Sequence, residues 1–326
     1  MLFKKMRSRL CVLGLVALAV TTTPVLAQPW PTKPITLVVV FSPGGPVDVV
    51  ARIVAKGLSD ELGQQVVVDS RPGAGGTLGA GTVARAEPDG YTLLLLNSGH
   101  TASETLYKNR KYDLMKNFAP VSLIGTSPNW LLVNAKSPFA SMQDLLAYAK
   151  AHPGKLTFAS GGAGGLTHLS SELMKESAHI DMVHVPYKGN APAFTDLIAG
   201  RVDMIFDQPI GSEAFVKSGQ LKPLAVTSRT RLPAWPQVPT MIEVGFPDYD
   251  VVAWYAVAAP SATPAPVVTR LNAALTKVLN SPDTHARLVA AGVTPSPSTP
   301  QELGARMGAD IAKWRGVIDR AGISLD

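Results

Sequence analysis

Cysteine is nearly absent from this sequence of 326 residues, where Cys11 is the only one. It lies in the apolar run Leu10–Val20, which follows four lysine and arginine residues. The run is shorter than the roughly 20 residues that span a bilayer, which disfavours a membrane anchor. Val25 and Ala27 supply small residues at the −3 and −1 positions of a cleavage site. We therefore expect residues 1–27 to be a signal peptide cleaved after Ala27, leaving an exported protein without thiol, disulfide or cysteine metal site.

The chain also has little excess of charge of either sign. The whole chain has 30 basic and 24 acidic residues, and loss of the four basic residues of the leader leaves a net charge of +2. No basic run is interleaved with aromatic residues, so the sequence does not favour nucleic acid as a partner. The 299 residues that follow the leader exceed one typical core, which favours two domains.

The usual signatures of catalysis and metal binding are missing or misplaced. The sequence has no G-x-x-x-x-G-K-[ST] phosphate loop and no G-x-S-x-G nucleophile elbow. Gly79–Ala84 fits the G-x-G-x-x-A pattern of dinucleotide folds, but it lies inside a predicted helix rather than at its start. The histidines lack metal-ligand spacing, and His168 is better placed to brace the loop before it. We expect no metal, no cofactor and no enzymatic activity.

Short β-branched runs alternate with helix-like stretches from Ile35 to Thr227. This alternation is typical of an α/β fold with mostly parallel sheets and flanking helices. Prolines then interrupt regular structure, before helical segments are predicted over Pro264–Leu279 and Pro300–Ala321. These final helices need a sheet to cover, so we expect the chain to return to the first domain.

The return predicts two crossings, near Ile124–Pro128 and near Val251–Ala253. Two crossing strands form a hinge between domains. We therefore expect a discontinuous domain I over residues 28–125 and 252–326, and a domain II over residues 126–251.

Three glycine-rich turns each follow a predicted strand and lead into a helix: Phe41–Asp48, Pro72–Thr77 and Ser160–His168. The start of a helix offers unpaired N–H groups and partial positive charge, and glycine lets a ligand approach the backbone. Glycine also serves tight connections in any α/β protein, so one such turn alone is weak evidence. Three together predict an anion site beyond the carboxyl ends of the strands.

Two acidic residues near these turns have open roles. Asp48 lies in the first turn of a predicted helix, where it can contact a ligand or satisfy backbone N–H groups of its own helix. Asp207 ends a predicted strand and can meet a ligand amine or hydroxyl, or cap the following helix.

Several stretches resemble the Bug family, the periplasmic receptors of tripartite tricarboxylate transporters. The matching residues are Trp30–Ile35, Phe41–Asp48, Ala51 and Arg52, Arg71–Gly76, Val185–Ala193 and Gly200–Asp203. The resemblance implies a two-domain Venus-flytrap fold, a small carboxylate held between the domains, and delivery to membrane permease subunits. It also leads us to expect a monomer. The alternative functions are a ligand-sensing receptor for a membrane sensor and a periplasmic enzyme.

The same resemblance assigns the ligand contacts to particular residues. They are Phe41, Ser42, Gly44, Gly45, Asp48, Gly76, Thr77, Asn97, Ser98, His100, Ser160, Gly161, Gly162, Gly164, Thr167, Tyr187 and Asp207. The sequence departs from the family where Gly161, Gly165 and Leu166 replace usual hydroxyl residues, and where Val47 replaces a small or hydroxyl residue. Lost hydroxyls remove hydrogen bonds that select a ligand, so the identity of the acid stays open.

Overall fold

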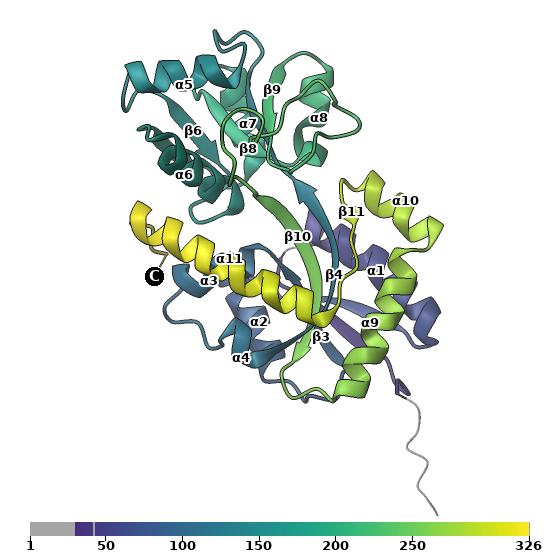
Figure 1. The fold of residues 1–326 in the computed structure, drawn as a ribbon. Coiled ribbons are helices and arrows are strands. Elements are labelled where there is room, and N and C mark those ends of the chain that lie inside the picture. Colours follow the sequence, from purple (N-terminus) through teal and green to yellow (C-terminus); the bar gives the residue numbers. More distant parts are fainter. Residues whose placement is uncertain (1–29, 42, 326) are drawn as a thin grey trace, which may run out of the picture.

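The computed structural model describes residues 30–41 and 43–325, so the predicted signal peptide, Cys11 and Ser42 lie outside the described residues. The chain forms two α/β lobes, one above the other in Figure 1. The first lobe contains a six-stranded sheet with the order β11 (Thr294–Pro295), β4 (Phe118–Pro128), β10 (Val252–Pro260), β3 (Thr92–Asn97), β1 (Ile35–Val39) and β2 (Val66–Ser70).

The second lobe contains a five-stranded sheet with the order β7 (Val183–Pro186), β6 (Thr157–Ser160), β8 (Met204–Asp207), β5 (Trp130–Asn134) and β9 (Leu221–Val226). Its helices are α5 (Met142–Ala151), α6 (Leu166–Ala178), α7 (Asn190–Ile198) and α8 (Pro209–Lys217). The first lobe has α1 (Pro46–Leu62), the 3₁₀ turn η1 (Ala74–Gly76), α2 (Thr77–Ala84), α3 (Gly99–Leu106), α4 (Leu114–Asn117), α9 (Ala265–Leu279), α10 (Pro282–Ala290) and α11 (Pro300–Ala321). The two-lobed α/β fold is the one predicted.

In each sheet four strands point in one direction, as expected of mostly parallel sheets, and the exceptions are β5, β10 and the short strand β11. Strand β1 is parallel to β2 and β3, and β6 is parallel to β7 and β8. Strand β10 is antiparallel to β3 and β4, and β5 is antiparallel to β8 and β9. The reason is the crossing between lobes: β5 and β10 begin at the junction, whereas β3, β4 and β8 end there.

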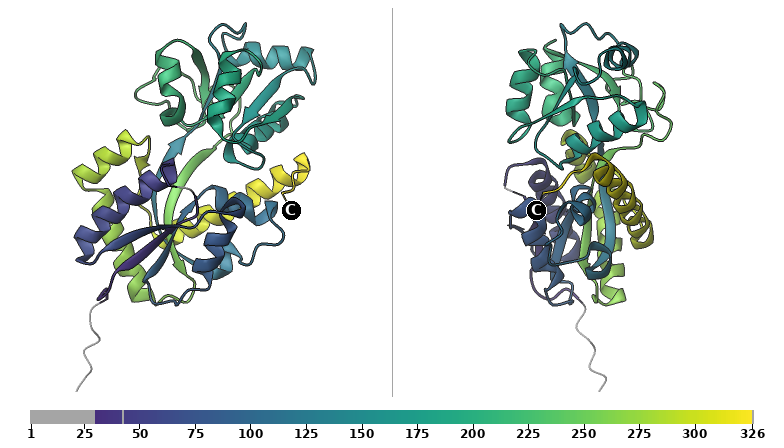
Figure 2. Two further views of the ribbon diagram at one scale, coloured as in Figure 1. Left: turned by 180° about the vertical axis from the view of Figure 1, so that it is seen from behind. Right: turned by 90° about the vertical axis from the view of Figure 1, so that its left-hand side faces the viewer.

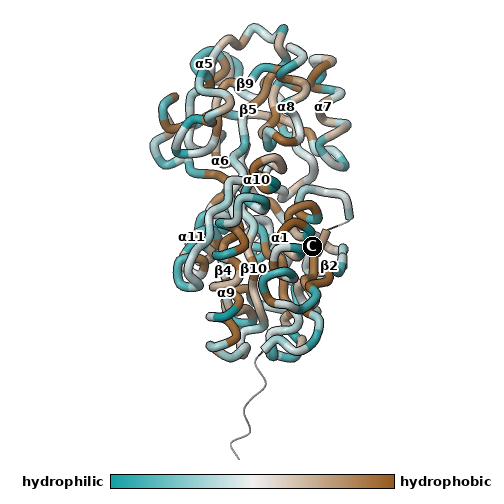
Figure 3. Tube along the Cα trace, turned by 90° about the vertical axis from the view of Figure 1, so that its right-hand side faces the viewer, coloured by the Kyte–Doolittle hydropathy of each residue, from teal (hydrophilic) through white to brown (hydrophobic). Residues whose placement is uncertain are grey.

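Each lobe has its own apolar core, and Figure 3 shows hydrophobic segments in both. Strand β1 is apolar along most of its length because helices cover both faces of its sheet. Helix α1 turns Val50, Val54 and Leu58 inward at helical spacing, and all three are at most 1 % exposed. Each such side chain contributes about 1.5–3 kcal/mol to folding.

The two long strands β4 and β10 connect the lobes and pair with each other from Val252 opposite Pro128 to Pro260 opposite Phe118. At the crossing, Asn129 N–H donates to Thr227 Oγ1 at 2.9 Å, and Thr227 N–H donates to the Asn129 carbonyl at 2.8 Å. These bonds hold the start of β5 beside the end of β9.

Helix α11 also reaches the second lobe. It lies along the first lobe, and its C-terminal end approaches the junction (Figure 2). Trp314, Val317 and Ile318 belong to the same apolar cluster as residues of the second sheet such as Leu131 and Phe206. None of the helices in residues 30–41 and 43–325 is long and apolar enough to cross a membrane.

Candidate functional site

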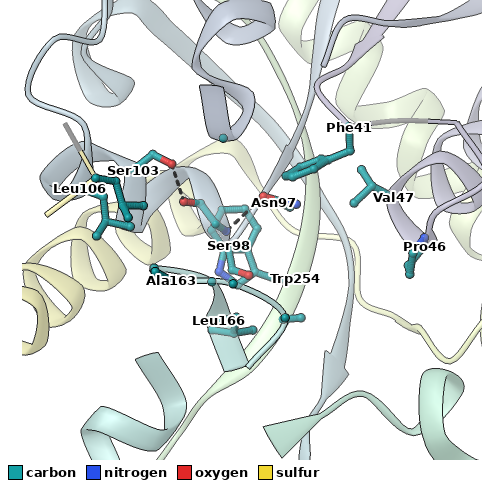
Figure 4. Close-up of a pocket in the computed structure, with 18 of the residues that line it drawn as sticks. Phe41, Pro46, Val47, Asn97, Ser98, Ser103, Leu106, Ala163, Leu166 and Trp254 are labelled. Carbon is teal, nitrogen blue, oxygen red and sulfur yellow. Dashed lines mark hydrogen bonds between the residues drawn. The ribbon is translucent and has the colours of Figure 1, made fainter. Parts of the chain in front are cut away.

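A cleft of about 490 Å³ lies between the two lobes (Figure 4). The first lobe lines it with Phe41, Pro46, Val47, Gly75, Asn97, Ser98, Gly99, Ser103, Leu106, Tyr107, Ala253, Trp254, Tyr255 and Leu325. The second lobe lines it with Gly161, Gly162, Ala163, Gly164, Gly165, Leu166 and Gln208. The cleft therefore lies beyond the carboxyl ends of β1, β3, β6 and β8, where open α/β sheets bind ligands.

Four helices begin at this cleft. Pro46 and Val47 open α1, Gly99 opens α3, Leu166 opens α6, and Gln208 is the N-cap of α8. The first N–H groups of a helix lack intrahelical partners, and the helix dipole adds partial positive charge. This arrangement can hold a carboxylate without a basic side chain.

The loop of the second lobe is held from behind by two histidines. The N–H of Gly164 donates to His168 Nδ1 at 2.9 Å, so His168 braces the loop before it, as predicted. Ser160 Oγ lies 2.7 Å from His184 Nε2, and the rings of His168 and His184 stack with 3.8 Å between centroids. Burial lowers the pKa of His184 to about 4, so this ring is neutral at pH 7.

In the first lobe, Asn97 fixes the turn between β3 and α3. Its Oδ1 accepts from the N–H of Gly99 at 3.1 Å and lies 2.9 Å from His100 Nδ1. Burial lowers the pKa of His100 to about 4, so its ring is neutral at pH 7. His100 thus supports the wall of the cleft rather than lining it.

The structure brings six of the predicted site residues to the cleft: Phe41, Asn97, Ser98, Gly161, Gly162 and Gly164. The others that it describes lie behind or beside the wall. Gly76 precedes α2 and packs against Val40, and Thr77 Oγ1 donates to the Ala74 carbonyl. Thr167 Oγ1 accepts from the N–H of Gly161 at 3.4 Å, and Tyr187 donates its hydroxyl proton to Asp196.

Asp48 has the geometry of a loop brace. Its carboxylate accepts from the N–H of Gly44 at 3.0 Å and from Arg52 Nε at 2.9 Å, and its side chain is 5 % exposed. The hydrogen bond from Arg52 lowers the pKa of Asp48. Gly45 is the N-cap of α1, and Gly44 lines a separate groove outside the cleft.

We predict that Asp48→Ala lowers the free energy of unfolding by about 1–2 kcal/mol, because the N–H of Gly44 and the guanidinium of Arg52 lose their acceptor. Ligand affinity should change less than threefold. Urea denaturation and calorimetric titration measure the two quantities. A large loss of affinity at unchanged stability would instead make Asp48 a ligand contact.

Asp207 lies at the centre of a buried polar network beneath Gln208. Its side chain accepts from Ser212 Oγ at 2.7 Å and from Asn190 Nδ2, and the residue is 4 % exposed. Burial raises the pKa of Asp207 to about 6, against the opposing effect of these hydrogen bonds. Compared with the unfolded chain, the fold therefore favours the protonated form of this carboxyl.

We predict a pH-dependent effect of Asp207→Asn. The folded pKa exceeds the unfolded value of about 3.9, so the stability linked to this proton is complete below pH 4 and is lost as the pH rises through 6. Relative to the wild type, the variant should gain roughly 3 kcal/mol between pH 4 and pH 7. His100 and His184 titrate in the opposite sense, so urea midpoints must be compared at each pH; parallel profiles would contradict the prediction.

Residues of the cleft that the sequence did not single out come mostly from distant segments. Trp254 and Tyr255 lie on β10, Leu106 on α3, and Leu325 follows α11. The crossing predicted near Val251–Ala253 could have indicated the adjacent Trp254, since a strand that passes between lobes borders their cleft. No signal of the sequence indicates Leu325.

The described residues contain no group of three or more His, Cys, Asp or Glu side chains that could hold a metal ion. Comparison with solved structures gives close matches over most of the chain. One is Rpa4515 from R. palustris with adipate, at 38 % identity and a TM-score of 0.78, covering 91 % of this chain and all of that one. Two more are the periplasmic binding protein BugD (35 % identity, TM-score 0.75, covering 91 % of this chain and 100 % of that one) and MatC from Rhodopseudomonas palustris with bound malate (33 %, 0.75, 89 % and 100 %).

The two lobes, their crossing strands and the cleft between them define a periplasmic binding protein of the solute-receptor type. The family described as "Tripartite tricarboxylate transporter family receptor" matches residues 50–323. The chain belongs to this family, which confirms the resemblance to Bug proteins.

Proposed function

We propose that the protein captures a small carboxylate in the cleft between its lobes and delivers it to the membrane permease subunits of a tripartite tricarboxylate transporter. The observation that carries this proposal is the convergence of helix starts from both lobes on one cleft. Membership in the receptor family supports it, and so do two relatives that hold adipate and malate.

In this proposal the backbone N–H groups of Ala163 and Leu166 and the start of α3 hold the carboxylate, and Phe41, Asn97 and Ser98 complete its contacts. Residues 28–125 with 252–326 and residues 126–251 act as two domains that close around the ligand. The receptor works in the periplasm as a monomer, after cleavage following Ala27. A permease recognises the closed form because the ligand stabilises it over the open one.

A thermal-shift screen tests the proposal. Protein exported to the periplasm is purified, refolded to remove bound ligand, and mixed with mono-, di- and tricarboxylates, amino acids and aromatic acids. A ligand at one hundred times its Kd adds about 2.7 kcal/mol, which raises the Tm by a few degrees. Mass spectrometry of the same sample identifies the first residue of the exported protein and so tests cleavage after Ala27.

The alternatives predict different results. An enzyme converts the acid, whereas a receptor returns it unchanged to the NMR spectrum. A receptor for a membrane sensor binds the acid equally well. In that case, deletion of the permease leaves both the response of the sensor and the uptake of the acid unchanged. No shift in Tm with any acid of the panel would contradict carboxylate capture.

A further inference from the structure

The side chains that line the cleft are mostly apolar. Phe41, Pro46 and Val47 form one wall, Leu106 lies at the opposite side, and Leu166 comes from the second lobe (Figure 4). Leu325 also lines the cleft and lies near Gly164, as Leu106 does. Trp254 lies behind them on β10. The described residues that line this cleft include no lysine, arginine, aspartate, glutamate or histidine.

The polar side chains of the cleft are largely occupied by the protein itself. Ser103 Oγ donates to the Gly99 carbonyl at 3.0 Å, and Asn97 Oδ1 accepts from the N–H of Gly99 (Figure 4). Gln208 hydrogen-bonds with Tyr255. The backbone N–H groups at the helix starts suit one carboxylate, whereas few side chains, chiefly Asn97 and Ser98, remain to bind substrate hydroxyls.

We infer that the cleft selects carboxylates with an apolar body, aliphatic or aromatic, over hydroxylated acids; this inference rests on the function proposed above. The carboxylate lies at the helix starts, and the body lies against Phe41, Val47 and Leu166. Each methylene that leaves water gains about 0.8 kcal/mol, whereas a buried hydroxyl without a partner costs roughly 1–3 kcal/mol. One unpaired hydroxyl thus lowers affinity about tenfold to a hundredfold.

Two pairs of acids test this selection by calorimetric titration. Adipate and galactarate are six-carbon dicarboxylates without and with four hydroxyls, and hexanoate and gluconate are six-carbon monocarboxylates without and with five. Within each pair the charge and chain length are equal. We expect the unsubstituted acid of a binding pair to bind at least about tenfold more tightly.

Variants connect the selection to the wall of the cleft. Val47→Thr keeps the shape of the side chain and adds one hydroxyl inside the cleft, so it should reduce the preference for adipate over galactarate at least threefold. Val49→Thr makes the same change on α1, on a side chain that is 41 % exposed and does not line the cleft. This control should keep the wild-type preference.

The outcomes separate the two proposals. The apolar selection is wrong, and carboxylate capture stands, if galactarate or gluconate binds as tightly as its unsubstituted partner. The same holds if the acid found by the screen carries hydroxyls and its analogue without them binds no more tightly. Equal effects of Val47→Thr and Val49→Thr likewise overturn the role of Val47. If no acid binds at all, the proposed function itself fails.

Discussion

Gly162→Val should weaken binding of the strongest acid in the screen about 100-fold, which corresponds to roughly 2.7 kcal/mol. Gly162 lines the cleft, and a Cβ there would meet no protein atom nearer than the Tyr187 carbonyl oxygen at 3.8 Å. The added methyl groups therefore occupy space beside the ligand rather than space inside the protein. Calorimetric titration measures the affinity directly.

The backbone of Gly162 has a φ of +149°, which side chains rarely adopt, so the variant also loses about 1–2 kcal/mol of stability. Gly200→Val is a matched control, because Gly200 has a φ of +72°, no neighbour within 4 Å of its Cβ, and a position after α7 outside the cleft. It should lower the Tm similarly and leave affinity unchanged. Wild-type affinity in Gly162→Val would show that the ligand binds elsewhere.

Much of the fold could be predicted because it follows local patterns. The helix at Pro300–Ala321 has the predicted bounds, with Thr299 and Glu302 forming a capping box. Gly79–Ala84 lies inside α2, as its distance from the preceding strand indicated. Helix α3 was missed: Gly99–Leu106 contains few strong helix formers, and it is held by packing against α11.

The site was less predictable than the fold. The glycine loops were found because glycine and helix starts leave a local pattern, and Gly161, Gly162 and Gly164 do line the cleft. The apolar wall from Leu106, Trp254 and Leu325 depends on which distant segments pack together, and leucine has the same local pattern in a core as in a cleft. Whether the predicted residues contact a ligand remains a prediction for the titrations above.

Trp130→Ala should lower the free energy of unfolding by about 3–5 kcal/mol, the cost of removing a large aromatic side chain from a packed core. Trp130 is fully buried at the start of β5, directly after the crossing. Its Nε1–H donates to Ser212 Oγ at 2.8 Å, and its ring meets that of Trp235 edge-on at 5.5 Å. Urea denaturation followed by circular dichroism measures the change.

Trp130→Phe separates packing from hydrogen bonding. It keeps an aromatic ring in the core but loses the indole N–H, so we expect it to retain well over half of the lost stability. Ser212 then still donates to Asp207, and the polar network beneath Gln208 persists. Because that network supports a wall of the cleft, Trp130→Ala should also weaken ligand binding at temperatures where the protein remains folded, whereas Trp130→Phe should not. An unchanged urea midpoint in Trp130→Ala would mean that this side chain does not hold the second lobe together.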